Sequence, residues 1–395
     1  MQKEKNYMKK KILICGADGY LGWPTAMYLS EKGYQVTAID NFSKRKIENE
    51  NNIKPLNRIE TMQIRVKTWK KISNRKIDFV YLDLNNYKAL HDLLSKKKFD
   101  VIIHYGEQPS APYSMVGREQ AAFTQNNNVL GTLNLLFAMK RHCPKAHLIK
   151  LGTMGVYGTP NIDIEEGYLN IRHKGRQDKC LFPMKPHSFY HLSKAHDSLN
   201  IEFACRVWGL KATDLNQGVV YGTEIELKKN HENLNTSFHY DHLFGTVINR
   251  FLVQAALGQP LTIYGTGNQT RTFLNINDTM KCIELSIKNP AKIGEYKVRN
   301  QFTEVYSINQ LANLVKKASN KIGIKCKIKF LQNPRIELKK HYYKPTNKSF
   351  IKLGLNPLKL NINYLSKEIK KISKYKDNVD LNIIYPTVKW DQAKK

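Results

Sequence analysis

Acidic residues are scarce in this sequence, which carries 33 Asp and Glu against 64 Lys and Arg and a formal net charge of +31. A surplus of cations of this kind can neutralise the phosphates of nucleic acids or membranes. Here the cations are spread over the whole length, as at residues 96–98, 228–229 and 370–371. The spread favours solvated lysine-rich surfaces, whose positive field attracts anionic substrates, and we expect no nucleic-acid partner.

Long apolar runs and closely spaced cysteines are missing as well. No run approaches the ~20 apolar residues that cross a bilayer, and residues 1–8 lack the apolar stretch of a signal peptide. We therefore expect no membrane insertion and a cytoplasmic location, or the plastid stroma in a photosynthetic eukaryote. The six cysteines form no CxxC pair and no zinc-binding spacing with histidine, which predicts reduced, mostly buried thiols and no metal site.

Short apolar runs alternate with helix-like stretches in the first half of the chain. An apolar run at residues 10–15 leads through glycines into a helix-like stretch at residues 20–32. Further strand-like runs lie at 35–40, 79–83, 101–104 and 147–151, and helix-like segments lie at 87–95 and 128–140. The alternation predicts an α/β fold of Rossmann type, a doubly wound parallel sheet covered on both faces.

The length of 395 residues allows two domains. We expect a dinucleotide-binding domain at 9–217 and a smaller substrate-binding lobe at 218–390, some segments of which return to the first domain. The basic stretch 41–76 is longer than a normal crossover and predicts a helical excursion on the surface or an oligomer arm. Other expected elements are helices at 188–208, 243–257 and 362–372, strands at 211–216, 261–264 and 271–275, and a loop at 223–235.

Gly16, Gly19 and Gly22 follow the first strand at a three-residue spacing and precede a helix. In that context they predict a dinucleotide-binding turn, with the phosphates at the helix N-terminus. Asp40 ends the second strand, where a carboxylate can accept from the ribose hydroxyls of NAD, although the nearby Arg45 tempers the preference over NADP. The remaining residues predicted to bind the cofactor are Asp18, Tyr20, Leu21, Asn41, Asp83, Leu84, Tyr190 and Lys194.

Tyr190 and Lys194 stand one helical turn apart in the stretch 188–194. An ammonium one turn from a phenol is expected to lower the pKa of that phenol from its ordinary value near ~10. The phenol can then exchange a proton with a sugar hydroxyl while a nicotinamide exchanges the hydride. Taken alone the spacing is more typical of an exposed helix face, but behind a glycine turn it favours a hydride-transfer site.

The three glycines together with Tyr190 and Lys194 resemble the extended short-chain dehydrogenase/reductase family of NAD-dependent epimerases and dehydratases. Longer blocks are similar to the UDP-sulfoquinovose synthase family, and the resemblance runs from about Lys11 to Trp390. It weakens at 41–76 and in the lysine-rich tail. The blocks are residues 107–108, 110–114, 127–132, 151–155, 161–168, 188–194, 214–222 and 341–343.

The resemblance implies an enzyme, formally a hydrolase of carbon–sulfur bonds, that converts UDP-glucose and sulfite to UDP-sulfoquinovose for a sulfolipid or a glycan. Tyr190 would take the proton of the glucose 4-hydroxyl while tightly bound NAD takes the C4 hydride, and Thr153 would hydrogen-bond the same oxygen. Water would leave from C5 and C6, sulfite would add to C6, and the hydride would return. The resemblance also implies a homodimer, and it leaves open whether free sulfite or a sulfite-supplying protein partner delivers the sulfur.

Two positions depart from related patterns. Nucleotide-sugar dehydratases place an acid and a base directly after the threonine, whereas here Thr153 is followed by Met154 and Gly155. His191 is then the candidate for proton transfer near neutral pH, although it could equally be a packed neighbour of the substrate. The family's arginine after Glu-Gln is Pro109 here, so another cation must hold sulfite or the last step is altered.

The resemblance also implies a set of substrate contacts. Arg271 and Arg335 would bind the diphosphate, because a planar guanidinium suits phosphate oxygens. Asn216 would meet the sugar phosphate, and Asn128 would steady the Lys194 region through a water. The predicted substrate-binding residues are Gln108, Ser110, Tyr113, Asn128, Thr153, Asn216, Gln217, Gln269, Arg271, Arg335 and Tyr342.

Two other functions fit parts of the same sequence. One is a UDP-hexose 4-epimerase or 4,6-dehydratase of the same fold, which would turn over UDP-glucose without sulfite. The other is a catalytically silent dinucleotide-sensing or nucleic-acid-binding protein that uses the +31 charge. Tyr190, Lys194 and Thr153 together count against the silent protein.

Overall fold

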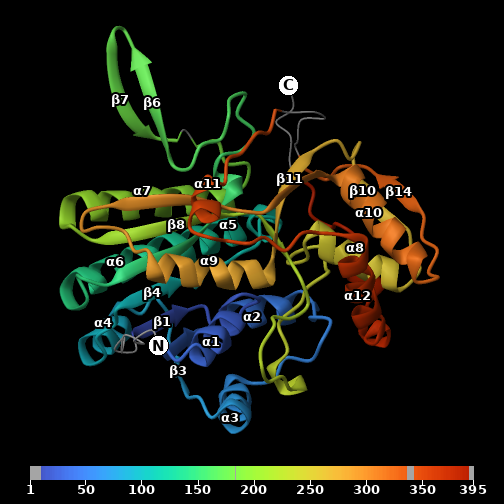
Figure 1. Cartoon of the computed structure of the whole chain (residues 1–395), viewed down its shortest axis with the longest axis horizontal. Coiled ribbons are helices and arrows are strands. Elements are labelled where there is room, and N and C mark those ends of the chain that lie inside the picture. Colours follow the sequence, from blue (N-terminus) through green and yellow to red (C-terminus); the bar gives the residue numbers. More distant parts are fainter. Residues whose placement is uncertain (1–9, 183, 336–341, 391–395) are drawn as a thin grey trace, which may run out of the picture.

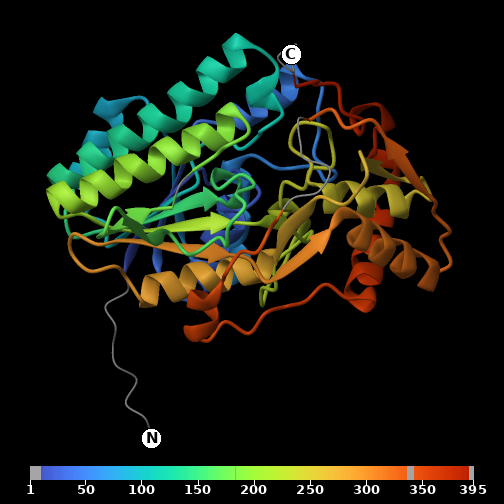
Figure 2. The same ribbon diagram turned by 90° about the horizontal axis from the view of Figure 1, so that it is seen from above.

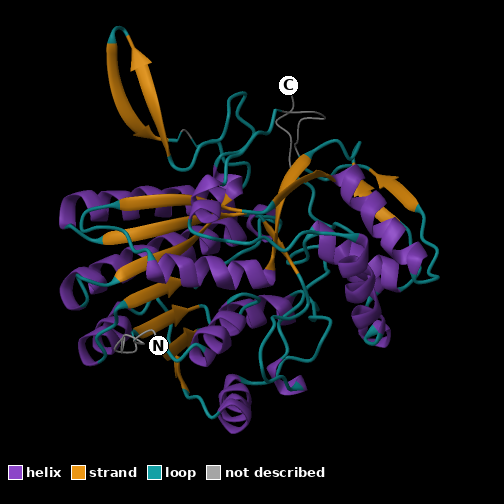
Figure 3. Cartoon of the chain, in the orientation of Figure 1, coloured by secondary structure: helices purple, strands orange, loops and turns teal. Residues whose placement is uncertain are grey.

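The computed structural model describes residues 10–182, 184–335 and 342–390. Within them, seven parallel strands form one sheet in the order β12-β8-β5-β4-β1-β2-β3. The α/β prediction and the parallel sheet are confirmed (Figures 1 and 3). The strands are β1 (Lys11–Cys15), β2 (Gln35–Asp40), β3 (Ile77–Tyr81), β4 (Val101–His104), β5 (His147–Thr153), β8 (Lys211–Gln217) and β12 (Tyr296–Gln301).

Helices cover both faces of this sheet, as Figure 2 shows. One layer holds α4, α6 and α7, whose apolar side chains share a core with the sheet, and α5 packs on α7. The other layer holds α1, α3 and α9, and Trp23, Trp69 and Ile283 pack in its core. The helices are α1 (Gly22–Glu31), α4 (Tyr87–Lys96), α5 (Arg118–Gln125), α6 (Gly131–His142), α7 (Phe189–Trp208) and α9 (Ile276–Lys288).

The strands at the centre of the sheet are almost entirely buried and mostly apolar, because helices cover them from both sides. β4 is buried at all four residues, and β1 is exposed only at Lys11. Continuous apolar strands of this kind are typical of parallel sheets. All of these strands end at the same edge, so the loops that follow β1, β4, β5 and β8 meet there.

A smaller lobe stands beyond that edge with a separate apolar core. Its strands are β9 (Val219–Tyr221), β10 (Leu261–Tyr264), β11 (Thr270–Asn275), β13 (Glu304–Ser307) and β14 (Ile328–Leu331). Its helices are α8 (Val247–Ala256), α10 (Ile308–Lys321) and α12 (Ile362–Ser373), and α11 (Lys348–Lys352) contacts β12. The chain between β11 and β13 leaves the lobe, since α9 covers the large sheet and β12 pairs with β8.

The basic stretch 41–76 is helical, as predicted, and part of it is buried. It forms α2 (Ser43–Glu50) and α3 (Met62–Ser73). Arg65 and Trp69 of α3 are fully buried, and the Arg65 guanidinium pairs with Asp18 of the glycine turn. A buried carboxylate draws two of the arginines of this stretch inward, and the role as a surface excursion or an oligomer arm stays a prediction.

An exposed hairpin was not predicted. It consists of β6 (Tyr168–His173) and β7 (Arg176–Leu181) and projects from the body of the molecule in Figure 1. Two expected helices are shorter than predicted, α1 and α8, because α1 starts only at Gly22 and α8 at Val247. All six cysteines lie in described residues and are free thiols, with Cys180 the least buried. No helix among the described residues has the length and apolar character that crossing a membrane needs.

Candidate active site

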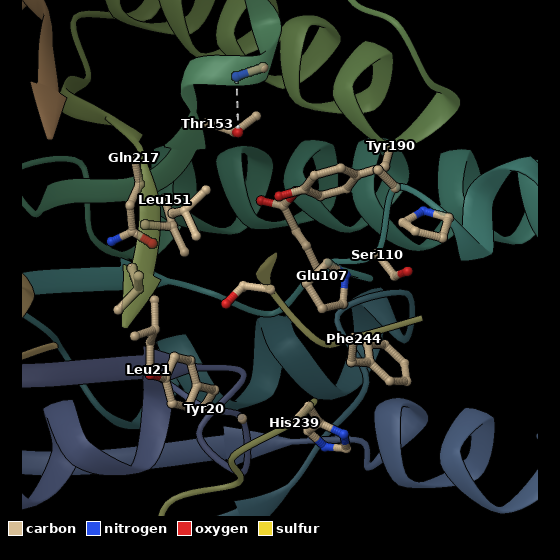
Figure 4. Close-up of a pocket in the computed structure, with 18 of the residues that line it drawn as sticks. Tyr20, Leu21, Glu107, Ser110, Leu151, Thr153, Tyr190, Gln217, His239 and Phe244 are labelled. Carbon is tan, nitrogen blue, oxygen red and sulfur yellow. Dashed lines mark hydrogen bonds between the residues drawn. The ribbon is translucent and has the colours of Figure 1, made fainter. Parts of the chain in front are cut away.

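A cavity of about 530 Å³ opens where the carboxyl edge of the large sheet meets the smaller lobe. Its wall includes the glycine turn after β1, the residue Thr153 at the end of β5, Tyr190 in the first turn of α7, and Arg271 of β11 (Figure 4). A crevice outside the carboxyl ends of parallel strands is the usual ligand site of doubly wound sheets. The fold therefore brings the predicted cofactor turn and the predicted hydride-transfer residues into one space.

The glycine turn has the shape that a dinucleotide phosphate needs. Gly16 has φ +77°, and a Cβ there would lie 2.6 Å from the backbone of Tyr105. A Cβ on Gly22 would lie 2.0 Å from the Gly16 carbonyl oxygen, so this glycine lets α1 pack against the turn. At Gly19 a Cβ would meet only that same oxygen, at 3.5 Å, on a residue that lines the cavity. Backbone N–H groups at the start of α1 can thus be approached closely, and the turn fits a pyrophosphate.

A buried ion cluster holds the glycine turn from behind. The Asp18 carboxylate accepts from Arg45 at 2.5 and 2.8 Å and from Arg65 at 2.9 Å. Arg45 also donates to the carbonyls of Ile59 and Glu60, at 3.3 and 2.8 Å. A forked guanidinium bound at both ends has little freedom. We call Asp18, Arg45 and Arg65 the glycine-turn cluster.

Asp40 closes the same region from the end of β2. Its two carboxylate oxygens accept from the N–H groups of Asp18 and Phe42, at 2.8 and 2.7 Å. Burial, together with the nearby charge of Asp18, raises the pKa of Asp40 to about 6. Next to it, Asn41 donates to Asp83 at 3.1 Å. These side chains lie where the adenosine half of a dinucleotide meets a Rossmann sheet.

Tyr190 and Lys194 lie on the opposite side of the cavity. The Lys194 ammonium donates to the Leu151 carbonyl at 2.7 Å and forms an ion pair with Glu107 at 2.7 Å. It stands 5.8 Å from the centroid of the Tyr190 ring. Burial first, and then the Glu107 carboxylate, raises the pKa of Tyr190. The expectation of a lowered pKa is not met, because burial of the phenol dominates and the Glu107 carboxylate acts in the same direction.

Thr153 and His191 explain why no carboxylates follow the threonine. The Thr153 hydroxyl accepts from the Gly155 N–H at 3.1 Å (Figure 4). A Cβ on Gly155 would lie 2.2 Å from the His191 ring, so the imidazole fills the space that a side chain at position 155 needs. The ring is also held by Ser188, whose hydroxyl meets Nδ1 at 2.9 Å. The histidine is packed beside the threonine and lines the cavity.

Sequence comparison extends the likeness over the whole chain. The profile of the NAD dependent epimerase/dehydratase family matches residues 12–300. The chain is 48% identical over 382 residues to the chloroplastic UDP-sulfoquinovose synthase of Spinacia oleracea, covering 97% of this chain and 79% of the spinach protein. It is 40% identical over 383 residues to the UDP-sulfoquinovose synthase of Sulfolobus acidocaldarius, covering 96% and 97%. The chain belongs to the UDP-sulfoquinovose synthase family.

The family consists of NAD-dependent enzymes. The predicted family membership and the predicted cofactor class are therefore confirmed. Among solved structures, the fold is similar to that of UDP-glucuronic acid 4-epimerase from Bacillus cereus, determined with UDP-glucuronic acid and NAD. The TM-score is 0.66 at 22% identity, over 93% of this chain and 99% of the epimerase. At that identity the likeness concerns the fold, which is the expected one.

Many of the predicted ligand residues line the cavity. Beside the glycine turn they include the two predicted residues in the loop after β3, Asp83 and Leu84, and several polar side chains of the lobe. From the cofactor set they are Gly16, Asp18, Gly19, Tyr20, Leu21, Gly22, Asp40, Asn41, Asp83, Leu84 and Tyr190, and from the substrate set Ser110, Thr153, Gln217, Gln269, Arg271 and Arg335. Their roles as ligands remain predictions.

Other predicted residues lie behind the wall. Asn128 donates to Ser193 at 2.9 Å, Asn216 donates to the Tyr157 hydroxyl at 2.7 Å, and Gln108 donates to Thr124 at 2.8 Å. Their amides support the wall, and the structure offers no position in the lining for them. Tyr113, Tyr342, Arg45 and Lys194 are also outside the lining, and the Tyr342 hydroxyl is bound to Asp163. His341, part of one quoted block, lies outside the described residues.

The sequence reasoning missed several residues of the wall. Glu107 is the most consequential, since it pairs with Lys194 and its side chain is only 1% exposed. Its position just after β4, at the sheet edge where ligands bind, could have indicated a role in the site. Tyr343 lines the cavity where Tyr342 was expected to. Other unpredicted lining residues that carry polar groups or rings include Lys44, Ser237, His239, Phe244, Arg250 and Tyr264.

Proposed function

We propose that this protein converts UDP-glucose and sulfite to UDP-sulfoquinovose. The observation that carries the proposal is the single cavity in which a dinucleotide turn, Tyr190 and Thr153 meet the cationic lining of the lobe. The proteins from Spinacia oleracea and Sulfolobus acidocaldarius, named UDP-sulfoquinovose synthases, support it over nearly the whole chain. NAD, when bound, accepts a hydride at the start and returns it at the end.

The glycine turn and Asp40 would hold NAD with its nicotinamide towards Tyr190. Tyr190 then takes the proton of the glucose 4-hydroxyl and gives it back to the C4 oxygen in the last step. Thr153 donates to that same oxygen and orients it. Positioned proton transfer of this kind contributes about 10²–10⁴-fold to a rate. In the same proposal, Lys194 keeps its place through the Leu151 carbonyl.

His191 is our candidate for the proton at C5 and the leaving hydroxyl at C6. A ketone at C4 acidifies the C5 proton, so a modest base suffices. The imidazole lies against Gly155, beside Thr153, in the lining of the cavity. Its Nδ1 contact with Ser188 fixes the ring, which is what a proton carrier needs.

The lobe would hold the nucleotide and the sulfur anion. Arg271, Arg335 and Gln269 line the cavity on the lobe side and suit a diphosphate. For sulfite we propose Lys44 in place of the family's arginine at position 109. The Lys44 ammonium lies 4.6 Å from the Phe244 ring, and the preceding Leu243 carbonyl accepts from Ser110 at 2.6 Å, directly beside Pro109.

We also propose a homodimer that forms through α6 and α7. Four apolar side chains on these helices are 44–52% exposed, and exposed apolar patches mark interaction sites. They are Phe137, Leu199, Phe203 and Val207. A second copy of the chain would cover them. For the compartment, we propose the cytoplasm or a plastid stroma, supported by the six free thiols and the chloroplastic spinach relative.

The test is incubation of the purified protein with UDP-glucose and sulfite, with the product read by mass. We expect a sulfonated nucleotide sugar and no product when sulfite is left out. UDP-galactose, or a stable 4-keto-6-deoxy sugar formed without sulfite, would instead support the epimerase or dehydratase. Protein that retains NAD and makes no sulfonated product contradicts the proposal. Sulfite offered free or through a sulfite-releasing protein distinguishes the two sources.

A further inference from the structure

Behind the cavity wall, two buried carboxyl groups lie together. Glu107 follows β4, and Asp197 is on α7, seven residues after Tyr190 and three after Lys194, so all three side chains of α7 share one face of the helix. Asp197 is fully buried, and the side chain of Glu107 is 1% exposed. The Lys194 ammonium pairs with Glu107 at 2.7 Å, and Asp197 stands one turn from Lys194 on the same helix face, where its carboxyl group interacts electrostatically with Glu107.

These carboxyl groups lack donors. Apart from the ion pair of Glu107 with Lys194, no N–H or O–H group of the described residues is in hydrogen-bond geometry with any of their four oxygens. An ionised carboxylate only accepts, so two ionised groups could not bond to each other. Two like charges side by side without water are also strongly unfavourable. One proton between the groups removes both difficulties.

We propose that Glu107 and Asp197 share a single proton, and that this pair is a positioning element that sets the charge beside Tyr190. The proton resides on Asp197, which donates to Glu107, and Glu107 in turn carries the negative charge that balances Lys194. Glu107, Lys194 and Asp197 are hereafter the tyrosine-side cluster. Its effect on turnover rests on the function proposed above, whereas the shared proton itself does not.

The charges around the pair place the proton on Asp197. Burial, and then Glu107, raises the pKa of Asp197 well above its ordinary value. Burial also acts to raise the pKa of Glu107, but the Lys194 ammonium 2.7 Å away, together with Lys150, outweighs it and lowers this pKa. His104, 3.7 Å from Glu107, is neutral because burial lowers its pKa to about 4.

The remaining charges close to the pair balance one another. Lys150 lies 3.6 Å from Asp214 and donates to the Lys194 carbonyl at 3.0 Å. The shared-proton pair, with one negative charge, balances Lys194. A neutral total is the state in which buried charges cost least.

The consequence concerns the phenol. Figure 4 shows the Glu107 side chain extending towards Tyr190. While Glu107 is ionised, it cancels the effect of Lys194 and the phenol keeps its proton, which is the form that returns a proton to C4. If Glu107 loses its charge, Lys194 acts unopposed and the phenol ionises at lower pH. The place of the shared proton therefore sets which form of Tyr190 prevails.

Infrared spectroscopy of the NAD-loaded protein tests the shared proton without any substrate. At a pH where exposed carboxyls are ionised, we expect a carbonyl band of a buried carboxylic acid that disappears in Asp197→Asn. The matched control is Asp178→Asn on the exposed hairpin, which should leave the band in place. A wild-type band that survives in Asp197→Asn overturns the proposal.

The pH profile of turnover tests the charge-setting role. Where Tyr190 must act as a base, activity rises with pH through its pKa. Glu107→Gln removes the opposing charge and should move this limb by about one to three pH units to lower pH. Asp197→Asn keeps a donor to Glu107 and the same net charge, so the rising limb of the pH profile should stay in place. Asp197→Leu, of similar size, removes the donor that stabilises the charge of Glu107 and should move the limb to lower pH.

An unmoved limb in folded Glu107→Gln, or equal limbs in the Asn and Leu variants at Asp197, contradicts the role. Circular dichroism and bound NAD show whether each variant is folded. If Glu107→Gln does not fold, the two Asp197 variants still decide the question. If no sulfonated product forms with any variant, the function proposed above fails, and the infrared result continues to decide the shared proton.

Discussion

Two buried ion clusters support opposite ends of the same cavity, and they are built differently. In the glycine-turn cluster, Asp18 accepts from two arginines whose guanidinium groups are held at fixed angles. In the tyrosine-side cluster, Lys194 is the charged partner of Glu107, and no donor among the described residues bonds to Asp197. Both oxygens of the Asp18 carboxylate are therefore held by cations, whereas the carboxyl pair of the second cluster shares one ammonium.

The difference matches what each end must do. A turn that receives a phosphate has to keep one shape, and a carboxylate bound by the fork of Arg45 and by one nitrogen of Arg65 provides that rigidity. A site that takes and returns a proton needs groups whose protonation can change, and a partly satisfied buried pair has this property. We infer that rigidity belongs to the cofactor end and proton exchange to the sugar end. The predictions below test this division.

Tyr190→Phe should break the tyrosine side while leaving the glycine turn intact. Without the hydroxyl no proton can move at C4, and turnover should fall by about 10²–10⁴-fold. NAD content should match that of the wild type, because the glycine turn does not depend on the phenol. Product formation by mass and NAD released on denaturation are the two measurements. Turnover near the wild-type level would remove Tyr190 from its role, and loss of NAD would contradict the separation of the two ends.

Arg65→Met should weaken the glycine turn while leaving the tyrosine side intact. The guanidinium is fully buried on Asp18, and removing one partner of a buried pair costs about 3–5 kcal/mol, of which the remaining Arg45 recovers a part. We expect a clear drop in the free energy of unfolding and in NAD content. The fraction that still holds NAD should turn over at the wild-type rate. Lys88→Met, which removes an ammonium whose side chain is 88% exposed, is the control. Equal stability of the two variants would contradict the structural role of Arg65.

The buried strands and the glycine turn could be predicted from the sequence, whereas the exposed hairpin could not. β2 and β4 begin and end where predicted, because buried parallel strands are rich in apolar and β-branched residues. The glycine turn was predictable, since its spacing follows from backbone geometry. The hairpin β6–β7 was not, because its residues are largely exposed on both faces and leave no alternating pattern.

The ion clusters themselves could not be predicted. Arg65 lay in a basic stretch that resembled a solvated surface, and only the fold brings it to Asp18. Glu107 and Asp197 belong to different elements that meet only in the tertiary structure. For the same reason the pKa of Tyr190 moves opposite to the expected direction, since burial and a carboxylate distant in sequence both raise it. Spacing along one helix does not report what packs against it.

Asp40 is expected to have a smaller effect, which is measured as the pH dependence of NAD affinity. Its pKa is raised to about 6, and the ionised carboxylate is the form that accepts from ribose hydroxyls. NAD affinity should therefore weaken about tenfold for each pH unit below about 6. The contribution of Asp40 to folding runs the other way, because its folded pKa lies above the unfolded value of about 3.9, so it favours the folded chain as pH falls through 6. Titration calorimetry of the stripped protein measures the affinity, and Asp40→Asn should abolish the dependence. A flat affinity in the wild type would rule out the ribose contact.

Arg45→Lys is the mildest change, and it separates the two arginines of the glycine-turn cluster. Arg45 holds both oxygens of Asp18 with two nitrogens, and its side chain is 29% exposed against 0% for Arg65. A lysine keeps the charge and loses the fork, so we expect a loss of about 1 kcal/mol in unfolding free energy and a small loss in NAD affinity. Arg58→Lys, at a side chain 86% exposed, should change neither. Because the guanidinium is occupied by Asp18, the preference for NAD over NADP should persist in Arg45→Lys. A variant that gains NADP binding would show that a cation released from Asp18 can meet the extra phosphate, and that the Arg45 fork keeps the charge away from it.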